Sequence, residues 1–352
     1  MKNTFLIKSF IFMMSLAVVM SCSKKDDEPN TGGNNGGGNA VTSITLEASS
    51  LQGNVGDVIK FKVKTNTGED ITSSSTITVS GASVSNASFT ISLPCTFSAV
   101  AGYNGLSSNT LSLTGNSTLP IARFKKNVLI EDFTGNWCGF CPRVSYATEL
   151  AKQQSTQIVD VGAHYNDPMS SQASTDLHNL KNITGWPTAY LNRKTLWNYP
   201  ENNNVSQVIN LTGNDGKMGL ALSPTINGNV LSLNVELSFS GDYESFCNEN
   251  KIVVYVVEDG LIYSQSNYTD FYGGVDLIQN FEHNSVLRGA MTSVSGEVII
   301  PENGSKTYST SIPSNIQNIS NVRVVAFVIN GEGKVQNVRA AGIGETQILE
   351  VI

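Results

Sequence analysis

The chain has 352 residues, of which 40% are hydrophobic and 14% charged, and its formal net charge is −7. This length fits two or three domains, and the hydrophobic fraction allows packed cores, so a globally disordered chain is excluded. The acidic balance argues against nucleic acid and anionic membrane surfaces as electrostatic partners, and five cysteines are too few for a disulfide scaffold.

The first segment, residues 1–21, is predicted to be a signal peptide. Basic residues precede an apolar run over 10–20, which is too short to span a bilayer as a helix. The run ends at Ser21-Cys22, and a small residue before a cysteine resembles a bacterial lipoprotein signal. That resemblance implies that Cys22 carries the lipid and becomes the new N-terminus; an ordinary secretory signal is the alternative. Residues 22–40 are rich in Gly and Asn and are predicted to be a flexible tether.

Residues 41–119 show the alternation of a half-buried sheet. In Ile59-Lys60-Phe61-Lys62-Val63 the apolar residues face one way and the lysines face the other. With turn residues at short intervals, this pattern predicts a small β-sandwich. The runs Ser43–Leu46 and Thr96–Ala99 resemble bacterial Ig-like domains of surface proteins, which implies a spacer module.

Residues 120–215 have a different pattern. The apolar run Val128-Leu129-Ile130 does not alternate, as expected for a strand that is covered on both faces. Helices and strands are then expected in turn at 146–151, 158–163, 170–182 and 188–192. This order predicts an α/β domain over 120–215.

Residues 216–352 are predicted to form a C-terminal β-sandwich. Apolar residues alternate from Leu231 to Phe239, and the continuous apolar runs 252–257 and 324–329 suit strands of a sandwich core. Between these runs lies a long stretch of little periodicity. It is either a recognition surface or an internally packed loop, and it contains the aromatic residues Tyr263, Tyr268, Phe271, Tyr272 and Phe281.

The motif Trp137-Cys138-Gly139-Phe140-Cys141-Pro142 lies where a buried strand passes into a helix. A thiol at a helix N-terminus lies near the positive end of the helix dipole, which favours the thiolate. A second thiol three residues later can close a disulfide with the first and can resolve a mixed disulfide with a substrate. A permanent structural disulfide is the alternative.

Metal and haem sites do not fit this motif. A zinc site needs four ligands, but Cys95 and Cys247 are isolated and no histidine has finger spacing. A c-type haem needs histidine where this chain has Pro142. We therefore expect no metal and no cofactor. Cys95 and Cys247 are expected either to form an interdomain disulfide or to remain buried thiols.

Residues 127–195 resemble a thioredoxin-fold domain, in which a tryptophan precedes a redox CxxC. The resemblance implies that Cys138 is the attacking thiol and Cys141 the resolving thiol. It also implies that Asp132 is the buried acid that assists proton transfer; an ordinary carboxylate at a strand end is the alternative. Pro187 matches the cis-proline beside the CxxC, and a cis peptide bond is accessible mainly before proline. The substrate groove would be formed by Trp137, Trp186 and Pro187.

A narrower resemblance covers about 120–300. The segments Glu131–Gly135, Gly162-Ala163-His164 and Glu282–Arg288 are similar to those of the twenty-eight-kilodalton outer-membrane protein family of surface lipoproteins. This resemblance implies location and fold more than reaction. Among the histidines, His178 is expected to be solvated on a polar helix face.

Together these patterns predict a multidomain α+β protein with an Ig-like β-sandwich, a thioredoxin-like α/β domain and a C-terminal β-sandwich. The predicted function is thiol–disulfide exchange on exported or surface proteins. The alternative is a surface binding or adhesion protein whose CxxC is structural. The expected location is the outer membrane, reached through the lipid on Cys22, with the protein facing the cell surface or the periplasm.

Overall fold

The structure is a computed structural model that describes residues 40–352. The predicted signal peptide, Cys22 and the tether up to residue 39 lie outside the described residues. Of the described residues, 46% are in strands and 12% in helices. None of the helices within 40–352 is long and apolar enough to cross a membrane.

Residues 44–116 form two sheets that share one core, in the order β1–β3–β6 and β2–β9–β7–β4–β5, with β8 paired to β7. Leu46, Val63 and Leu113 are buried between them, and the predicted β-sandwich character of this region is confirmed. The strands are β1 (Ile44–Ala48), β2 (Gln52–Asn54), β3 (Val58–Thr65), β4 (Thr76–Val79), β5 (Ala82–Ser83), β6 (Ser88–Thr90), β7 (Thr96–Tyr103), β8 (Leu106–Ser107) and β9 (Leu111–Asn116), with a short helix η1 (Thr72–Ser74).

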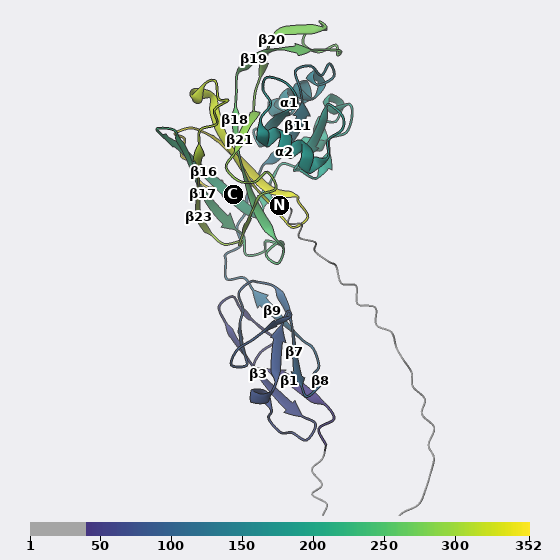
Figure 1. The fold of residues 1–352 in the computed structure, drawn as a ribbon, viewed down its shortest axis with the longest axis vertical. Helices are drawn as coiled ribbons and strands as arrows, with labels where there is room; N and C mark the ends of the chain where they lie inside the picture. The colour runs from purple at the N-terminus through teal and green to yellow at the C-terminus, as the bar shows by residue number, and fades with distance from the viewer. Residues whose placement is uncertain (1–39) are drawn as a thin grey trace, which may run out of the picture. The chain divides into compact units, whose positions relative to one another are not determined.

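The largest element is a nine-stranded sheet in the order β14–β13–β11–β12–β21–β18–β24–β25, with β22 paired to β18. The pairs β11–β12 and β12–β21 are parallel, and the others are antiparallel. In Figure 1, β18 and β21 lie beside β11. The strands are β11 (Val128–Thr134), β12 (Ile158–His164), β13 (Thr188–Leu191), β14 (Thr195–Leu196), β18 (Asn250–Glu258), β21 (Val286–Ala290), β22 (Glu297–Ile299), β24 (Val322–Ile329) and β25 (Val335–Gly342).

Helices cover both faces of the β11–β12 part of this sheet. α1 (Pro142–Gln154) and α3 (Val205–Ile209) pack on one face, and α2 (Gln172–Lys181) packs on the other. Pro142 at the first position suits the start of α1, because that residue needs no intrahelical N–H bond. Two short helices, η2 (Glu201–Asn203) and η3 (Ile319–Asn321), complete the helical segments of the described residues.

The remaining strands form three small sheets. The strands β16 (Met218–Asn227), β17 (Val230–Phe239) and β23 (Gly304–Ser311) form an antiparallel sheet, and β10 (Phe124–Lys126) pairs with β15 (Gly213–Gly216). The hairpin β19 (Leu261–Ser266) and β20 (Leu277–His283) projects from the sheet, near α1.

Strands β18 and β24 are buried on both faces, which explains their continuous apolar sequences. Ile252, Val254 and Val256 point into a core shared with β16 and β17. The alternate residues Val253 and Tyr255 point into a second core shared with β11, β12 and α2. Strand β18 therefore contributes side chains to two hydrophobic cores. Because both of its faces are buried, its residues do not alternate between apolar and polar.

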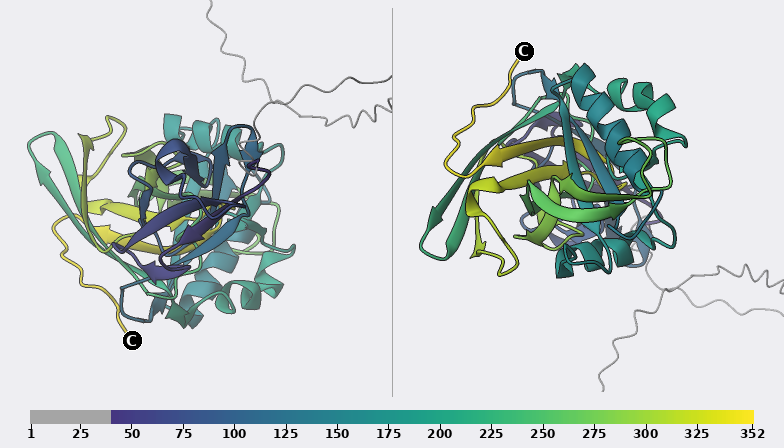
Figure 2. Two further views of the ribbon diagram at one scale, coloured as in Figure 1. Left: turned by 90° about the horizontal axis from the view of Figure 1, so that it is seen from below. Right: turned by 90° about the horizontal axis from the view of Figure 1, so that it is seen from above.

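The predicted fold class is wrong in its central part. Strands β11, β12 and β13 do not form a self-contained thioredoxin-like α/β domain over 120–215, because they continue into a sheet with β21, β18, β24 and β25. Gly162 in β12 pairs in parallel with Val286 in β21, and the N–H of Gly162 donates to the carbonyl of Ser285 at 2.8 Å. Figure 2 shows the yellow C-terminal strands among strands from the middle of the chain. The protein is mostly β, with sandwich character.

Cys95 and Cys247, for which the sequence left two states open, form a disulfide. Cys95 lies in the segment before β7, and Cys247 lies between β17 and β18. The disulfide links the segment before β7 covalently to the segment between β17 and β18, and its two cysteines are 152 residues apart in the sequence.

Candidate active site

Cys138 and Cys141 form a disulfide immediately before α1. Their Sγ atoms are 2.05 Å apart and their Cα atoms 5.4 Å apart. The N–H of Cys138 donates to the carbonyl of Gly135 at 3.0 Å, and the carbonyl of Cys141 accepts from Val144 in the first turn of α1. Cys138 is 5% exposed and Cys141 is 1% exposed. Both cysteines therefore lie at a helix N-terminus and are almost completely buried.

Two tryptophans near the CxxC motif are in contact with each other. The rings of Trp137 and Trp186 are 5.5 Å apart in an edge-to-face arrangement, and the Trp186–Pro187 peptide bond is cis, as expected. Trp137 Nε1 donates to the carbonyl of Tyr165 at 2.8 Å, and the Tyr165 ring stacks on Trp186. The structure thus places Trp186, next to Pro187, beside the residue that precedes Cys138.

His178 packs against the rings of Tyr165 and Trp186. It is 3% exposed, so the expectation of a solvated side chain was wrong. Its Nε2 accepts a hydrogen bond from Trp186 Nε1 at 3.1 Å, and its Nδ1 bonds to the carbonyl of Ser174 at 2.8 Å. These partners require a neutral ring with the proton on Nδ1, and burial lowers the pKa of His178 accordingly.

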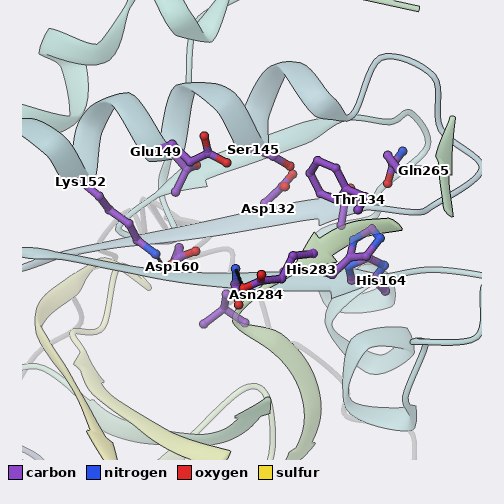
Figure 3. Close-up of a pocket in the computed structure, with 15 residues that line it drawn as sticks. Asp132, Thr134, Ser145, Glu149, Lys152, Asp160, His164, Gln265, His283 and Asn284 are labelled. Atoms are coloured by element: carbon purple, nitrogen blue, oxygen red, sulfur yellow. Dashed lines mark hydrogen bonds and ion pairs between the residues drawn. The ribbon is translucent and has the colours of Figure 1, made fainter. Parts of the chain in front are cut away.

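Asp132 borders a cavity of about 110 Å³ between α1, β12 and the β20 strand. Figure 3 shows its carboxylate beneath α1, with Ser145 and Glu149 on the helix side. Its Oδ1 is buried and has no hydrogen-bond partner within residues 40–352. Desolvation, and then the charges of Glu201 and Asp160, hold the pKa of Asp132 well above its usual value.

Two histidines line the opposite side of this cavity. His164 Nδ1 is 2.7 Å from Asp167 Oδ2, so His164 is a hydrogen-bonded buried residue. The rings of His164 and His283 are 5.2 Å apart, and His283 Nε2 is buried without a partner among the described residues. Burial lowers the pKa of His283 to about 3, and the charge of His164 adds to this effect. No group of His, Cys, Asp or Glu within 40–352 is arranged to hold a metal ion.

The aromatic stretch after β18 packs over the CxxC segment. The N–H of Tyr268 donates to the carbonyl of Gly139 at 2.6 Å, and Gln265 Nε2 donates to the carbonyl of Cys138 at 2.9 Å. The Phe271 ring stacks on Tyr146 of α1, with centroids 4.4 Å apart. The stretch therefore contacts both α1 and the CxxC loop, while the ring of Tyr268 is 66% exposed to solvent. Sequence reasoning assigned no role to Gln265, and no local pattern marks it.

Residues 174–347 match the family model of outer membrane protein Omp28. No curated protein sequence matches the chain. Among solved structures the chain is similar to HBP35 of Porphyromonas gingivalis, with 21% identity and a TM-score of 0.50 over 62% of this chain and 76% of that one. A domain of the outer membrane lipoprotein Omp28 from Porphyromonas gingivalis gives 16% identity and a TM-score of 0.26, over 37% of this chain and 89% of that one.

The family match bears on where the protein is located. The matched family is one of outer membrane proteins, so the match supports association with the outer membrane. At 21% identity the likeness to HBP35 concerns the fold alone.

Proposed function

We propose that this protein is an outer-membrane lipoprotein that exchanges disulfides with exported or surface proteins through Cys138 and Cys141. The observation that carries the proposal is the closed Cys138–Cys141 disulfide at the N-terminus of α1. Such a position favours the thiolate of the first cysteine after reduction, because the helix dipole and the free N–H groups stabilise negative charge. Trp137, directly before Cys138, and Phe140, between the two cysteines, are 42% and 52% exposed, and their rings would contact an incoming polypeptide.

The exchange is balanced in both directions. In one direction the Cys138 thiolate attacks a client disulfide, forms a mixed disulfide and releases one client thiolate. Cys141 then attacks Cys138 Sγ, which restores the internal disulfide and releases the second client thiolate. In the other direction a client dithiol reduces the internal disulfide by the same two steps in reverse. The direction depends on the reduction potential of the pair.

Asp132 is proposed to accept the proton that Cys141 loses before it attacks. Ser145, one turn after Cys141 in α1, lines the same cavity as Asp132. Because the pKa of Asp132 is raised by desolvation, its carboxylate is a stronger base than an exposed aspartate. The cavity gives this proton a route away from the buried carboxylate.

The proposed location rests on the N-terminal sequence and the family match. Cys22 follows a signal-type apolar run, and a diacylated cysteine provides the two chains that stable anchoring needs. The Omp28 match supports the outer membrane as the destination. The acidic residues Asp26, Asp27 and Glu28, which follow Cys22, resemble the export signal of surface-exposed lipoproteins and favour the cell-surface side over the periplasmic side.

The decisive experiment compares Cys141→Ser with Cys138→Ser in cells that export the protein. We expect the Cys141→Ser protein to accumulate mixed disulfides with clients, because its attacking thiol remains and its resolving thiol is absent. The Cys138→Ser protein is the matched control and should trap far fewer. Non-reducing electrophoresis followed by mass spectrometry of the trapped bands identifies the clients.

The reduction potential of the pair provides a second measurement. Exchange catalysts lie at roughly −120 to −270 mV, and structural disulfides usually lie below about −300 mV. A potential below that limit, with no client trapped by either variant, would refute exchange. The low exposure of both cysteines would then fit a structural disulfide in a binding or adhesion protein.

A further inference from the structure

The segment Gln265–Tyr268 lies directly on the loop that carries Cys138. Gln265 is 3% exposed, and its Nε2 donates to the carbonyls of Cys138 at 2.9 Å and Gly135 at 3.3 Å. The N–H of Ser266 donates to the carbonyl of Asn136 at 2.8 Å. The backbone from Gly135 to Cys138 is therefore held from outside by a segment 127 residues further along the chain.

Tyr268 covers Gly139, the first of the two residues between the cysteines. Its N–H donates to the carbonyl of Gly139, and its ring occupies the space in which a side chain at position 139 would begin. A Cβ at position 139 would lie 2.2 Å from the Tyr268 ring, which is far inside van der Waals contact. Glycine at this position therefore permits the close approach of the tyrosine. The rings of Phe140 and Tyr268 are also in edge-to-face contact, with centroids 5.6 Å apart.

The loop that follows Tyr268 contacts α1 through Phe271 and Tyr272. The Phe271 ring stacks on Tyr146, and the hydroxyl of Tyr272 donates to Glu149 Oε1 at 2.8 Å. The segment over the disulfide is thus supported at both ends, by the hairpin β19–β20 on one side and by α1 on the other.

From these contacts we propose that Gln265 and Tyr268 are positioning residues of the redox site. Gln265 holds the Cys138 loop in the conformation that closes the disulfide with Cys141, and Tyr268 shields that disulfide from attacking thiols. The inference deepens the proposed exchange function and rests on it for its biological role.

The two residues act on different quantities. A loop held near its closed conformation keeps the two thiols close, which favours the disulfide at equilibrium. Loss of the Gln265 donors frees that loop, so the equilibrium should move toward the dithiol. Tyr268 keeps its backbone N–H bond in any non-proline variant, so removal of its ring should change mainly the access of a thiol to Cys138 and hence the rate.

The test uses the purified full-length mature protein and dithiothreitol as the probe. Dithiothreitol supplies two electrons and two protons, the Cys138–Cys141 bond breaks to two thiols, and the probe becomes a cyclic disulfide. Gln265→Met, which retains the length but not the donors, should raise the equilibrium constant for reduction about tenfold, equal to about 30 mV. Tyr268→Ala should raise the reduction rate at least fivefold, with a smaller change in equilibrium.

Two further variants sharpen the result. Ile262→Ala lies on the same hairpin at a side chain that is 53% exposed, and it should match wild type within twofold. Gly139→Ala should raise the rate by displacing the Tyr268 ring, and it should add little when Tyr268 is already alanine. Such non-additivity indicates that both changes remove one contact.

The proposal is overturned if Gln265→Met and Tyr268→Ala both leave the equilibrium constant and the rate within twofold of wild type. Tyr268 is 66% exposed, so its alanine variant should fold. If circular dichroism shows that the Gln265→Met protein is unfolded, the result for Tyr268→Ala alone decides the proposal. The probe reaction needs no client. A protein that traps no client but responds here would refute exchange on exported proteins while supporting the positioning role.

Discussion

Arg193 and Glu131 form a buried ion pair in which Arg193 Nη2 donates to Glu131 Oε1 at 2.9 Å. Arg193 is 4% exposed and Glu131 is fully buried. Arg193 also donates to the hydroxyl of Tyr255 in β18 and, through Nη1, to the carbonyl of Val294 at 2.8 Å. The pair therefore binds β11 to the C-terminal strands, across the boundary at which the sequence predicts two separate domains.

We expect Glu131→Gln to lower the free energy of unfolding by about 3 kcal/mol, because it leaves the Arg193 guanidinium buried without a counter-charge. Urea denaturation followed by circular dichroism measures the change. The control is Lys251→Gln, which removes a partly exposed ion pair with Glu249 and should cost less than about 1 kcal/mol. Equal costs for the two variants would contradict the structural role of the buried pair.

Asp132→Asn should change the dependence of stability on pH. An acid whose folded-state pKa lies above its unfolded value of 3.8 makes stability fall as the pH rises from about 4 through the folded-state pKa. The amide removes that ionisation, so the variant should gain stability relative to wild type as the pH rises from about 4 to 8. Urea denaturation at several pH values tests this, and parallel curves for the two proteins would contradict the raised pKa.

The same substitution should slow catalysis. If Asp132 accepts the proton of Cys141, Asp132→Asn should slow the release of the mixed disulfide at least about tenfold, a modest share of a general-base effect. Single-turnover reaction with a fluorescent disulfide peptide separates this step from the first attack by Cys138. Unchanged release would remove Asp132 from the exchange mechanism.

His283→Gln should reduce the loss of stability in acid. His283 has a folded-state pKa of about 3 against an ordinary value of 6.5, so the unfolded chain binds the extra proton first. Stability is therefore complete above about pH 6.5 and falls by about 1.4 kcal/mol per pH unit below it, until the folded-state pKa is reached. The variant should lack this contribution. Titration of the histidine ring by nuclear magnetic resonance provides an independent value.

Cys22→Ser should release the protein from the membrane. The wild-type mature protein is expected to begin at a diacylated Cys22, and two acyl chains give stable anchoring. Mass spectrometry of the N-terminal peptide and fractionation of cells check this prediction. An unmodified N-terminus in the wild-type protein would refute lipidation.

Removal of the Cys95–Cys247 disulfide should destabilise the fold without affecting the CxxC. The bond closes a long loop, so the double alanine variant is expected to lose about 2–4 kcal/mol, in the usual range for a disulfide. Thermal unfolding measures the loss. The equilibrium of Cys138–Cys141 with dithiothreitol serves as the control and should not change.

Local chemistry could be predicted from the sequence, but strand pairing could not. The motif around Cys138 places two thiols before a helix, and this depends only on neighbouring residues. The apolar run 252–257 suits a strand of a sandwich core, and the structure shows that this strand is buried on both faces. Nothing in that run states which strands lie beside it, so its pairing with β21 and β24 and the shared sheet with β11 were not foreseen.

Contacts between distant residues account for what was missed at the site. Gln265 has no pattern that distinguishes it from a surface glutamine, because its role depends on carbonyl groups far away in the sequence. His178 falls on a helix with many polar residues, and the sequence does not show that Trp186 returns to cover it. In both cases tertiary packing, rather than local preference, decides the environment.

The parallel pairing of Gly162 in β12 with Val286 in β21 has a consequence for biosynthesis. Translation and export deliver the chain from its N-terminus, so the cysteines of the CxxC emerge well before the strands that complete their sheet. Until β21, β18 and β24 arrive, β12 has an open edge and the Cys138 loop lacks its cover. The thiols of Cys138 and Cys141 are therefore accessible to oxidants at this stage. They can also form non-native disulfides with Cys95 and, once it has emerged, with Cys247. Correct disulfide pairing therefore depends on when β18, β21 and β24 emerge relative to cysteine oxidation, as well as on the stability of the final fold.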